Sequence, residues 1–370
     1  MRVVLVLASS TGGIGRHVAA LVAGRAGGTD PLDVHVCGPA ATEDEFGFTA
    51  AGARFTAVEI PASPQPRDAA AVRALRRAMQ DGPRPAAVHA HGLRAGLVAA
   101  LARPGGCPLV VTWHNRVMAG GLRAAVYGPL ERYVARAADV NLGASADLVE
   151  RARRLGARDA RLGAVAAPVL PPPRRTAAEV RDELGAEPDQ PVILSVGRLH
   201  PQKRHDLLIA AAARWCGRRP VPLVAIAGTG PAYMPLAGLV SRLHAPVHLL
   251  GQRHDVSDLL GAADLAVVCS DWEARQLFAQ EALRAGVPLV ATAAGGVPDL
   301  VGDAALLVPP GDLDAIDAAV QRLLDDPDER ARYARRGPTQ AATWPTGADT
   351  VAHVRSVYAE LVDRSAAEAR

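Results

Sequence analysis

The sequence predicts an α/β protein built from two doubly wound parallel sheets. At 370 residues, the chain is longer than one hydrophobic core usually organises, so two domains are expected. Short apolar runs alternate with longer helical patterns from one end to the other, which is the pattern of βαβ units. The stretch PVLPPPRR at 168–175 interrupts this alternation, and its prolines indicate a stiff linker between the two halves.

Each half is expected to contribute five parallel strands separated by helices. The helical patterns include the Ala- and Arg-rich segments 68–80 and 119–137 and a capped amphipathic segment at about 346–366. The domains are expected at 1–170 and 171–345. The expected strands are the apolar runs at 2–8, 32–38, 86–91, 108–114, 139–145, 191–197, 222–228, 246–251, 264–270 and 288–294.

Composition excludes several classes of protein. Aromatic residues make up only 4% of the chain, too few for the stacking platforms of a nucleic-acid binder. No uncharged apolar run approaches the roughly 18 residues that span a bilayer, and the opening MRVVLVLASSTGG indicates a first strand rather than a signal peptide. The cysteines show no paired spacing, so no zinc site or disulfide framework is expected and a reducing cytoplasm is favoured; they are Cys37, Cys107, Cys216 and Cys269.

Basic charge is concentrated in the first half of the chain. Residues 1–170 carry 20 arginines against 13 acidic residues, whereas residues 171–370 carry 21 basic against 25 acidic residues. This excess favours an anionic partner or a membrane surface for the first half, which for a cytoplasmic protein is the inner face of the plasma membrane. Two interpretations stay open for the helix at 117–137, a basic amphipathic face on anionic lipid or an ordinary solvated face. The residues concerned are Arg116, Arg123, Arg132 and Arg136 around Val126, Leu130 and Val134.

A glycine-rich turn, TGGIGRHV at 11–18, opens a helix after the first strand. Backbone N–H groups at such a turn, here around Gly13, can approach an anion, although tight packing of helix on sheet also needs glycine. Val18 stands where the dinucleotide-binding fingerprint has its third glycine, and the second strand does not end in the acidic residue that holds a ribose. A nicotinamide-dependent oxidoreductase is therefore not expected.

Lys203, in the stretch GRLHPQKRH at 197–205, is the only lysine among the 41 basic residues. A compact ammonium on a flexible stem offers a point charge that the planar guanidinium of arginine does not. Lys203 lies just beyond a predicted strand and five residues after Arg198. This position favours a binding role over the chance survival of one lysine in an arginine-rich chain.

Two glutamates flank an expected helix start in the stretch CSDWEARQLFAQEALRAGVPLVATAAGGVPDLV at 269–301. The helix is expected to begin near Gln276, so that the amides of Arg275, Gln276 and Leu277 form a phosphate site. Glu281 lies further along this helix, where its carboxylate suits ribose hydroxyls, and Glu273 lies on the loop, within reach of a sugar.

This stretch resembles the E-x7-E motif of family 4 glycosyltransferases, which are retaining enzymes of the GT-B fold. The segments VGRLHPQKRHDLLIAAA (196–212), GTGP (228–231), LLGQRHDVSDLLGAADL (249–265) and the N-terminal GGIGRHV resemble further family segments. The resemblance implies two Rossmann-like domains that face a central cleft. Residues 1–170 would bind the acceptor and 171–345 the nucleotide sugar, with the C-terminal helix at 346–366 packing back on the first domain.

The resemblance also implies an activity and a set of site residues. It implies a retaining hexosyltransferase that moves a sugar from a UDP- or GDP-linked donor to an acceptor hydroxyl, with no metal and no other cofactor. The catalytic residues implied are His114, at the end of the strand in VVTWHNR, with Arg198, Lys203 and Glu273. The donor contacts implied are Gly13, Arg198, Lys203, Arg253 near the base, Arg275, Gln276, Leu277 and Glu281, and the sugar or acceptor contacts are His91, Gly295 and Gly296.

Some residues depart from the family pattern, and some alternatives stay open. The family writes Glu-Gly-Phe-Gly where this chain has Glu273, Ala274, Arg275 and Gln276, so a different sugar pocket is expected. The Asp-x-Asp spacing in GDLDAI (311–316) is interpreted as a helix N-cap rather than a metal site. A sugar-nucleotide epimerase or phosphorylase and an inactive nucleotide-sugar-binding scaffold remain alternatives to a transferase. The acceptor stays open among an antibiotic-type small molecule, a polyisoprenyl-linked sugar and a polysaccharide.

Overall fold

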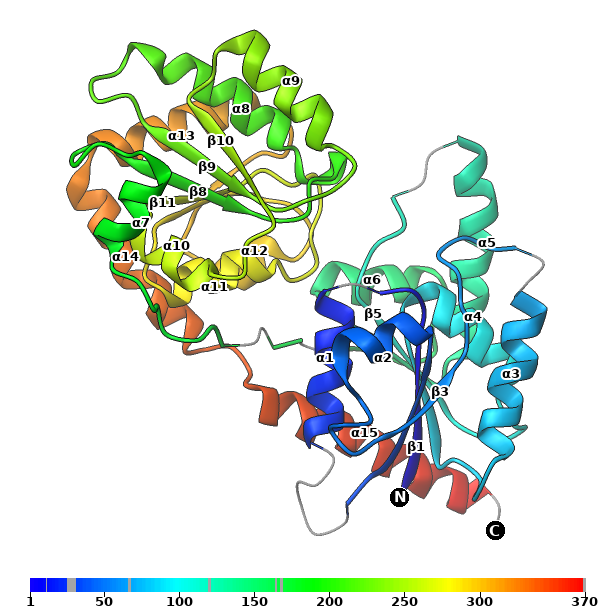
Figure 1. The fold of residues 1–370 in the computed structure, drawn as a ribbon. Coiled ribbons are helices and arrows are strands. Elements are labelled where there is room, and N and C mark those ends of the chain that lie inside the picture. Colours follow the sequence, from blue (N-terminus) through cyan, green and yellow to red (C-terminus); the bar gives the residue numbers. More distant parts are fainter. Residues whose placement is uncertain are drawn as a thin grey trace. The chain divides into compact units, whose positions relative to one another are not determined.

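A computed structural model describes residues 1–10, 12–24, 31–65, 68–118, 121–163, 165–166 and 169–368. The chain divides into two compact units, one formed by Met1–Pro168 with Pro345–Arg370 and the other by Val169–Trp344. Each unit is a parallel sheet with helices on both of its faces (Figure 1).

The sheet of the first unit has seven parallel strands in the order β3-β2-β1-β4-β5-β6-β7. The strand order therefore reverses between β1 and β4, and ligands of doubly wound sheets bind outside the carboxyl ends of strands at such a point. In the register of this pair, Leu7 at the end of β1 lies opposite His91 at the end of β4. The strands are β1 (Arg2–Leu7), β2 (Asp33–Gly38), β3 (Arg54–Ala57), β4 (Ala87–His91), β5 (Leu109–Trp113), β6 (Val140–Gly143) and β7 (Ala160–Leu162).

The C-terminal helix α15 (Gly347–Glu368) belongs to the first unit and lies along it at the red end of the chain (Figure 1). Its residues Val354, Val357, Tyr358 and Leu361 share one buried cluster with apolar side chains of the first sheet. The apolar positions of this helix recur at helical spacing, and that stripe is the face it buries. The other helices of the unit are α1 (Gly13–Ala23), α2 (Ala40–Phe46), α3 (Asp68–Gln80), α4 (Gly92–Ala102), α5 (Gly121–Ala137) and α6 (Ala146–Arg154).

The sheet of the second unit has six parallel strands in the order β10-β9-β8-β11-β12-β13. Its strand order reverses between β8 and β11, so the second unit has its own binding point at the carboxyl ends of these two strands. The strands are β8 (Val192–Val196), β9 (Leu223–Ala227), β10 (Val247–Gly251), β11 (Leu265–Val268), β12 (Leu289–Thr292) and β13 (Leu306–Val308). The helices are α7 (Ala177–Leu184), η2 (Pro201–Lys203), α8 (His205–Arg214), η3 (Trp215–Gly217), α9 (Tyr233–Leu243), α10 (Val256–Ala262), α11 (Leu277–Arg284), α12 (Val297–Val301), α13 (Leu313–Asp325) and α14 (Pro327–Ala341).

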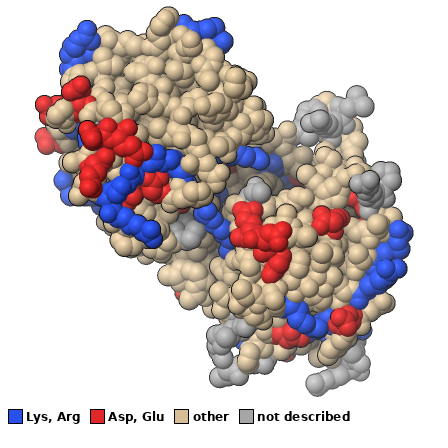
Figure 2. All heavy atoms as spheres, viewed as in Figure 1, with Lys and Arg blue, Asp and Glu red and all other residues tan. Residues whose placement is uncertain are grey.

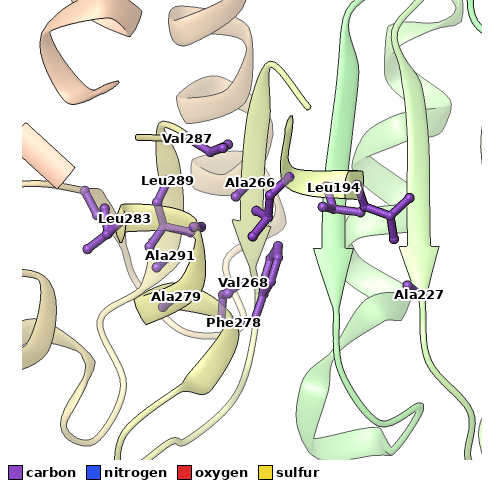
Figure 3. Packing of buried hydrophobic residues seen from close by; sticks show 14 of the residues in the cluster. Leu194, Ala227, Ala266, Val268, Phe278, Ala279, Leu283, Val287, Leu289 and Ala291 are labelled. Carbon is purple, nitrogen blue, oxygen red and sulfur yellow. The ribbon is translucent and has the colours of Figure 1, made fainter. Parts of the chain in front are cut away.

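The core of the second unit fixes α11, the helix that follows the E-x7-E loop. Phe278, Ala279 and Leu283 of α11 are buried and point toward β11 and β12 (Figure 3). Burying apolar side chains stabilises a fold by roughly 25 cal/mol per Å² of apolar surface, so the helix position is set by the sheet. The start of α11 is thereby held against the carboxyl edge of the sheet.

All ten expected strands form, each slightly shorter than its apolar run, and three further strands lie at sheet edges. The unexpected strands are β3, β7 and β13, of three or four residues each. Short strands at an edge need little apolar sequence, because solvent covers one side of them. The segment RFTA of β3, for example, mixes charged, polar and apolar residues.

Two interpretations were left open for the helix at 117–137, a basic amphipathic face on lipid and an ordinary solvated face, and the structure places this helix as α5 (Gly121–Ala137). Val134 is fully buried in the first unit, whereas Val126 is 52% exposed, so the two do not form one solvent-facing apolar stripe. Residues 119 and 120 and the side chain of Arg123 lie outside the described part of the chain. Among the described helices, none is long and apolar enough to cross a bilayer.

Candidate functional site

Two loops of the second unit meet at the carboxyl ends of β8 and β11. The first loop, 197–204, carries Gln202, whose side-chain amide donates to the carbonyl oxygen of Trp272 over 2.7 Å. The backbone N–H of Asp271 donates to the carbonyl oxygen of Gln202 over 2.9 Å, and Arg204 donates to the Asp271 carboxylate over 3.1 Å. These contacts hold the Lys203 segment and the Glu273 segment together across 70 residues of sequence.

Lys203 and Glu273 form an ion pair at this junction. The Lys203 Nζ atom donates to Glu273 Oε1 over 2.5 Å, and the two side chains are 20% and 12% exposed. Lys203 ends the 3-10 turn η2, which His200 caps by accepting from the backbone N–H of Gln202. Sequence reasoning gave these residues separate tasks toward a donor molecule, and the structure makes each the partner of the other.

Arg198 is the exposed cation of the same junction. No acidic side chain of the described residues pairs with its guanidinium. Its loop lies tightly against the GTGP segment, since Leu199 N–H donates to Thr229 O over 2.8 Å. A Cβ at Gly228 would lie 2.0 Å from the carbonyl oxygen of Gly197, so only glycine permits this approach. The guanidinium is therefore presented on a rigid loop.

Gly295 and Gly296 contact the backbone of Glu273 and fix its position. The Gly296 N–H donates to the carbonyl oxygen of Glu273 over 2.8 Å. Gly295 has a φ of +60°, and a Cβ there would lie 2.1 Å from the same carbonyl oxygen. Both the left-handed backbone and the close approach require glycine at 295. The GG pair of the sequence motif thus fixes the backbone that carries the carboxylate.

Helix α11 begins at Leu277, with Gln276 as its N-cap. The Gln276 side chain accepts a hydrogen bond from the N–H of Phe278 over 3.3 Å, so the protein itself caps that amide. Glu281 is 8% exposed and lies in α11, little more than one turn beyond the cap. The helix start near Gln276 is confirmed.

Arg275 is a largely buried cation beside this helix start. Its one described hydrogen bond is a long one, from Nη2 to Gln280 Oε1 over 3.4 Å, and its Nε atom is buried without a partner among the described residues. Burial and the nearby charge of Arg284 lower the pKa of Arg275 to about 10. No acidic group of the described chain offsets this charge, which makes an incoming anion the natural partner.

Arg253 does not present a free guanidinium. Its Nε donates to Asp255 over 2.8 Å and its Nη1 to Glu183 over 2.6 Å. These hydrogen bonds raise the pKa of Arg253. Arg175 of the proline-rich linker joins the same acidic residues and also Asp258, and the charges gather near α7 and α10 (Figure 2). The side chain expected near the base is therefore committed to an ion-pair network, and any contact with a base would have to come from its backbone.

In the first unit, His91 and His114 meet at the ends of β4 and β5. The Nδ1 of His91 lies 3.1 Å from the Nε2 of His114. His17, on α1, lies edge-on to both rings, with centroid separations of 5.5 Å to His91 and 5.2 Å to His114. Sequence reasoning omitted His17, although the motif GGIGRHV contains it and its position one turn beyond Gly13 placed it near the same strand ends.

The three imidazoles are buried and neutral. Burial lowers the pKa of His17 to about 4, and burial with neighbouring histidines holds the pKa of His91 and of His114 well below its usual value. Behind them His89 bonds through Nδ1 to the Tyr358 hydroxyl over 2.6 Å and through Nε2 to Thr112 over 2.7 Å. The C-terminal helix therefore helps to position this histidine cluster.

The structure also shows two helix starts that the sequence predicts, at Gly13 and at Asp312. Gly13 is the first residue of α1, and the preceding Gly12 has a φ of 92°, so a glycine turn does open this helix. Asp312 accepts a hydrogen bond from the N–H of Ala315 over 2.9 Å, and it is the N-cap of α13. The interpretation of Asp312 as a helix cap is confirmed.

Both halves of the chain match models of glycosyltransferase families. Residues 12–168 match the model described as "Glycosyl transferase 4-like domain", and residues 177–340 match the model described as "Glycosyl transferases group 1". Together the two models cover the chain except for its two ends and the linker between 168 and 177.

Curated relatives resemble about half of the chain. The D-inositol 3-phosphate glycosyltransferase 2 of Catenulispora acidiphila is 33% identical over 204 residues, 50% of this chain and 46% of the relative. The alpha-D-kanosaminyltransferase of Streptomyces kanamyceticus is 33% identical over 178 residues, 46% of each protein. The matched stretch thus spans about half the length of these relatives.

Solved structures resemble the whole chain in fold. HepE of Anabaena in complex with UDP has a TM-score of 0.77 and 18% identity, covering 97% of this chain and 100% of that one. The sucrose-phosphate synthase of Thermosynechococcus elongatus has a TM-score of 0.78 and 20% identity, covering 98% and 100%. The family models and this agreement in fold show that the chain belongs to the family 4 glycosyltransferases and has their GT-B fold.

Proposed function

We propose that this chain is a retaining glycosyltransferase that moves a sugar from a nucleotide-diphosphate sugar to an acceptor hydroxyl without a metal ion. The observation that carries the proposal is the junction of Arg198, Lys203 and Glu273 at the strand-order reversal of the second sheet. Two cations at the carboxyl edge of a doubly wound sheet suit an anionic ligand. HepE, which shares the fold, was solved with UDP and with UDP-glucose.

In this proposal the diphosphate lies between Arg198, Lys203 and the amides at 275–277. When the bond between the anomeric carbon and the diphosphate oxygen breaks, negative charge grows on the leaving group. The planar guanidinium of Arg198 can donate hydrogen bonds to two phosphate oxygens at once. The ammonium group of Lys203 can stay close to the leaving oxygen as a point charge while that oxygen moves away from the sugar. Losing one such donor typically raises the barrier by about 3 kcal/mol. The buried cation Arg275 adds positive potential at the same place.

The sugar and nucleoside would occupy the two sides of the diphosphate. Glu273, held by Gly295 and Gly296, would accept hydrogen bonds from sugar hydroxyls, and Glu281 would accept them from the ribose. Family membership supports retention of configuration through front-face attack, in which the departing phosphate accepts the acceptor proton. The proton then leaves with the nucleotide, and no side chain needs to remain protonated.

We assign the acceptor to the first unit, at the ends of β1, β4 and β5. His114 and His91 lie at these strand ends and are neutral, so their nitrogens can exchange hydrogen bonds with hydroxyl groups. Peripheral contact with an anionic bilayer is part of the proposal: on α5, Val126 is 52% exposed, and Arg132 and Arg136 are exposed as well.

The direct test is incubation of the purified chain with radiolabelled UDP-, GDP- and ADP-sugars in EDTA, with and without a panel of acceptor hydroxyl compounds. Transfer that depends on an acceptor and retains anomeric configuration is the expected result. An epimer or a sugar phosphate formed without acceptor would favour the epimerase or phosphorylase alternative. Tight nucleotide binding without turnover over the whole panel would favour a scaffold subunit.

A further inference from the structure

Three histidines from separate elements of the first unit converge at its carboxyl edge. His17 comes from α1, His91 ends β4, and His114 follows β5. One ring nitrogen of each lies within 4.8 Å of the corresponding atoms of the other two. The closest pair, His91 Nδ1 and His114 Nε2, is 3.1 Å apart. Convergence of three imidazoles on one point is costly to bury without a shared partner.

The hydrogen bonds of these rings are incomplete. The Nε2 atom of His91 is buried and has no hydrogen-bond partner in the described part of the chain. The ring of His17 touches its neighbours edge-on, and no described residue is recorded as its hydrogen-bond partner. The charges that act on His91 and His114 come from other histidines, His17 and His89 among them, and from no acidic residue. With the His91 proton on the unpartnered Nε2 and the His114 proton on Nδ1, the two nitrogens that face each other both present lone pairs to an ion, which replaces the hydrogen bond between them.

The separations suit a transition-metal ion. Histidine nitrogens bind Zn²⁺ at about 2.0–2.1 Å, which places two ligands of a tetrahedral ion about 3.3 Å apart. The pair of His91 and His114 is already near that separation. Rotation of His17 toward them would complete three ligands. Mg²⁺ and Ca²⁺ prefer oxygen ligands, and this cluster has none to offer.

We propose that His17, His91 and His114 bind one divalent transition-metal ion, Zn²⁺ or Co²⁺, and leave its fourth position open to water or a substrate hydroxyl. Imidazole binds metal in its neutral form, and one nitrogen of each ring lies within 4.8 Å of the other two. Because His114 would be a ligand, an ion here competes with the acceptor contact proposed for His114. The ion is therefore inhibitory and separate from the metal-independent transfer.

The binding test needs no substrate, so it stands even if the transferase assignment fails. Untagged protein is stripped with EDTA, dialysed against ZnCl₂ or CoCl₂, and analysed for metal per chain and for the visible absorption of four-coordinate Co²⁺. One ion per chain is expected. His17→Asn, His91→Asn and His114→Asn should each weaken binding by more than about tenfold, since loss of even a supporting residue costs 10- to 100-fold.

The matched control is His353→Ala, which removes an exposed histidine of α15 in the same unit. It should bind Zn²⁺ as the parent does, and circular dichroism should confirm that each cluster variant is folded. Absence of binding by the folded parent, or full binding by a folded His17→Asn variant, would overturn the proposal. In the transferase assay, saturating Zn²⁺ should inhibit and EDTA should restore turnover; unchanged turnover would refute His114 as a ligand.

Discussion

Lys203 Nζ lies 2.5 Å from Glu273 Oε1, so the cation proposed for the diphosphate is neutralised by a carboxylate proposed for the sugar. The pair is only partly exposed, and water screens it less than a surface pair. A donor molecule must therefore compete with Glu273 for Lys203. This relationship neutralises the Lys203 charge in the resting site and ties the Lys203 loop to the Glu273 loop.

Replacing Glu273 by Gln should tighten the binding of the nucleotide alone. Glu273→Gln removes the competing carboxylate while keeping its shape, so the Lys203 charge becomes available to a diphosphate. An increase in affinity for UDP or GDP of several-fold, about 1 kcal/mol, is expected in isothermal titration calorimetry. Turnover of the sugar donor should fall in the same variant. Weaker nucleotide binding would contradict the competition between the carboxylate and the diphosphate.

Gly295→Ala should damage the site through the backbone of Glu273. The new Cβ would lie 2.1 Å from the Glu273 carbonyl oxygen, and alanine is strained at a φ of +60°. We expect a loss of about 2 kcal/mol or more in the free energy of unfolding, measured by urea titration, together with lower turnover. Gly217→Ala is the matched control, because no atom lies within 4 Å of its added Cβ. Equal stability of the two variants would argue against the close approach at Gly295.

Arg275→Met should stabilise the protein and weaken the binding of nucleotide sugar. The buried guanidinium lacks an acidic partner among the described residues, so an apolar chain of similar length removes a desolvation cost. A gain of about 1–2 kcal/mol in the free energy of unfolding is expected. The control substitution is Arg242→Met, at an exposed arginine of the same unit. It should change neither the free energy of unfolding nor the affinity for nucleotide sugar. Stability that falls in Arg275→Met, or donor binding that is unchanged, would contradict the assignment.

The stability of the second unit should depend on pH through His205. Burial and the charge of Lys203 lower the pKa of this histidine to about 4, against a weaker opposing effect of Asp206. The folded state therefore binds fewer protons than the unfolded state, whose histidine titrates near 6.5. The contribution of the neutral, buried His205 to the free energy of unfolding is therefore fully present above about pH 6.5, and it is lost as the pH falls toward 4. At pH 5 the loss amounts to about 2 kcal/mol.

Urea unfolding at pH 7 and pH 5 checks this dependence. His205→Gln should flatten the change in unfolding free energy between the two pH values by about 2 kcal/mol. His254→Gln, which replaces an exposed histidine of the same unit, should leave the change as it is in the parent. Identical pH dependence of the parent and His205→Gln would contradict the buried, neutral state of His205.

Ten of the strands and the start of α11 followed from local sequence, because apolar runs and helix-capping residues act on their own neighbours. The pairing of Lys203 with Glu273 did not, since it joins residues 70 positions apart through the contacts of Gln202 and Asp271. The convergence of His17 with His91 depends on the β1–β4 register, which is a tertiary property. Periodicity likewise could not tell which apolar residues of α5 face the core: Val134 is fully buried, whereas Val126 is 52% exposed.

The ion-pair network of Arg253 was also beyond sequence reasoning. Asp255 lies two residues away, but Glu183 comes from α7, the first helix of the unit, and Arg175 comes from the linker. Which of many acidic residues meets a given arginine is decided by the fold. A sequence motif can therefore mark a loop as part of a site without telling which side chains on it are free.

The central claim, that Lys203 stabilises the charge of a departing nucleoside diphosphate, is tested most directly by the turnover of Lys203 variants with their donor sugar. Lys203→Ala should lower kcat by about 100-fold, equivalent to about 3 kcal/mol, while nucleotide affinity changes much less. Lys203→Arg should restore turnover only in part, because a planar guanidinium cannot replace a compact ammonium. Parent-like turnover of Lys203→Arg, or a Lys203→Ala variant that loses affinity without losing kcat, would contradict the account.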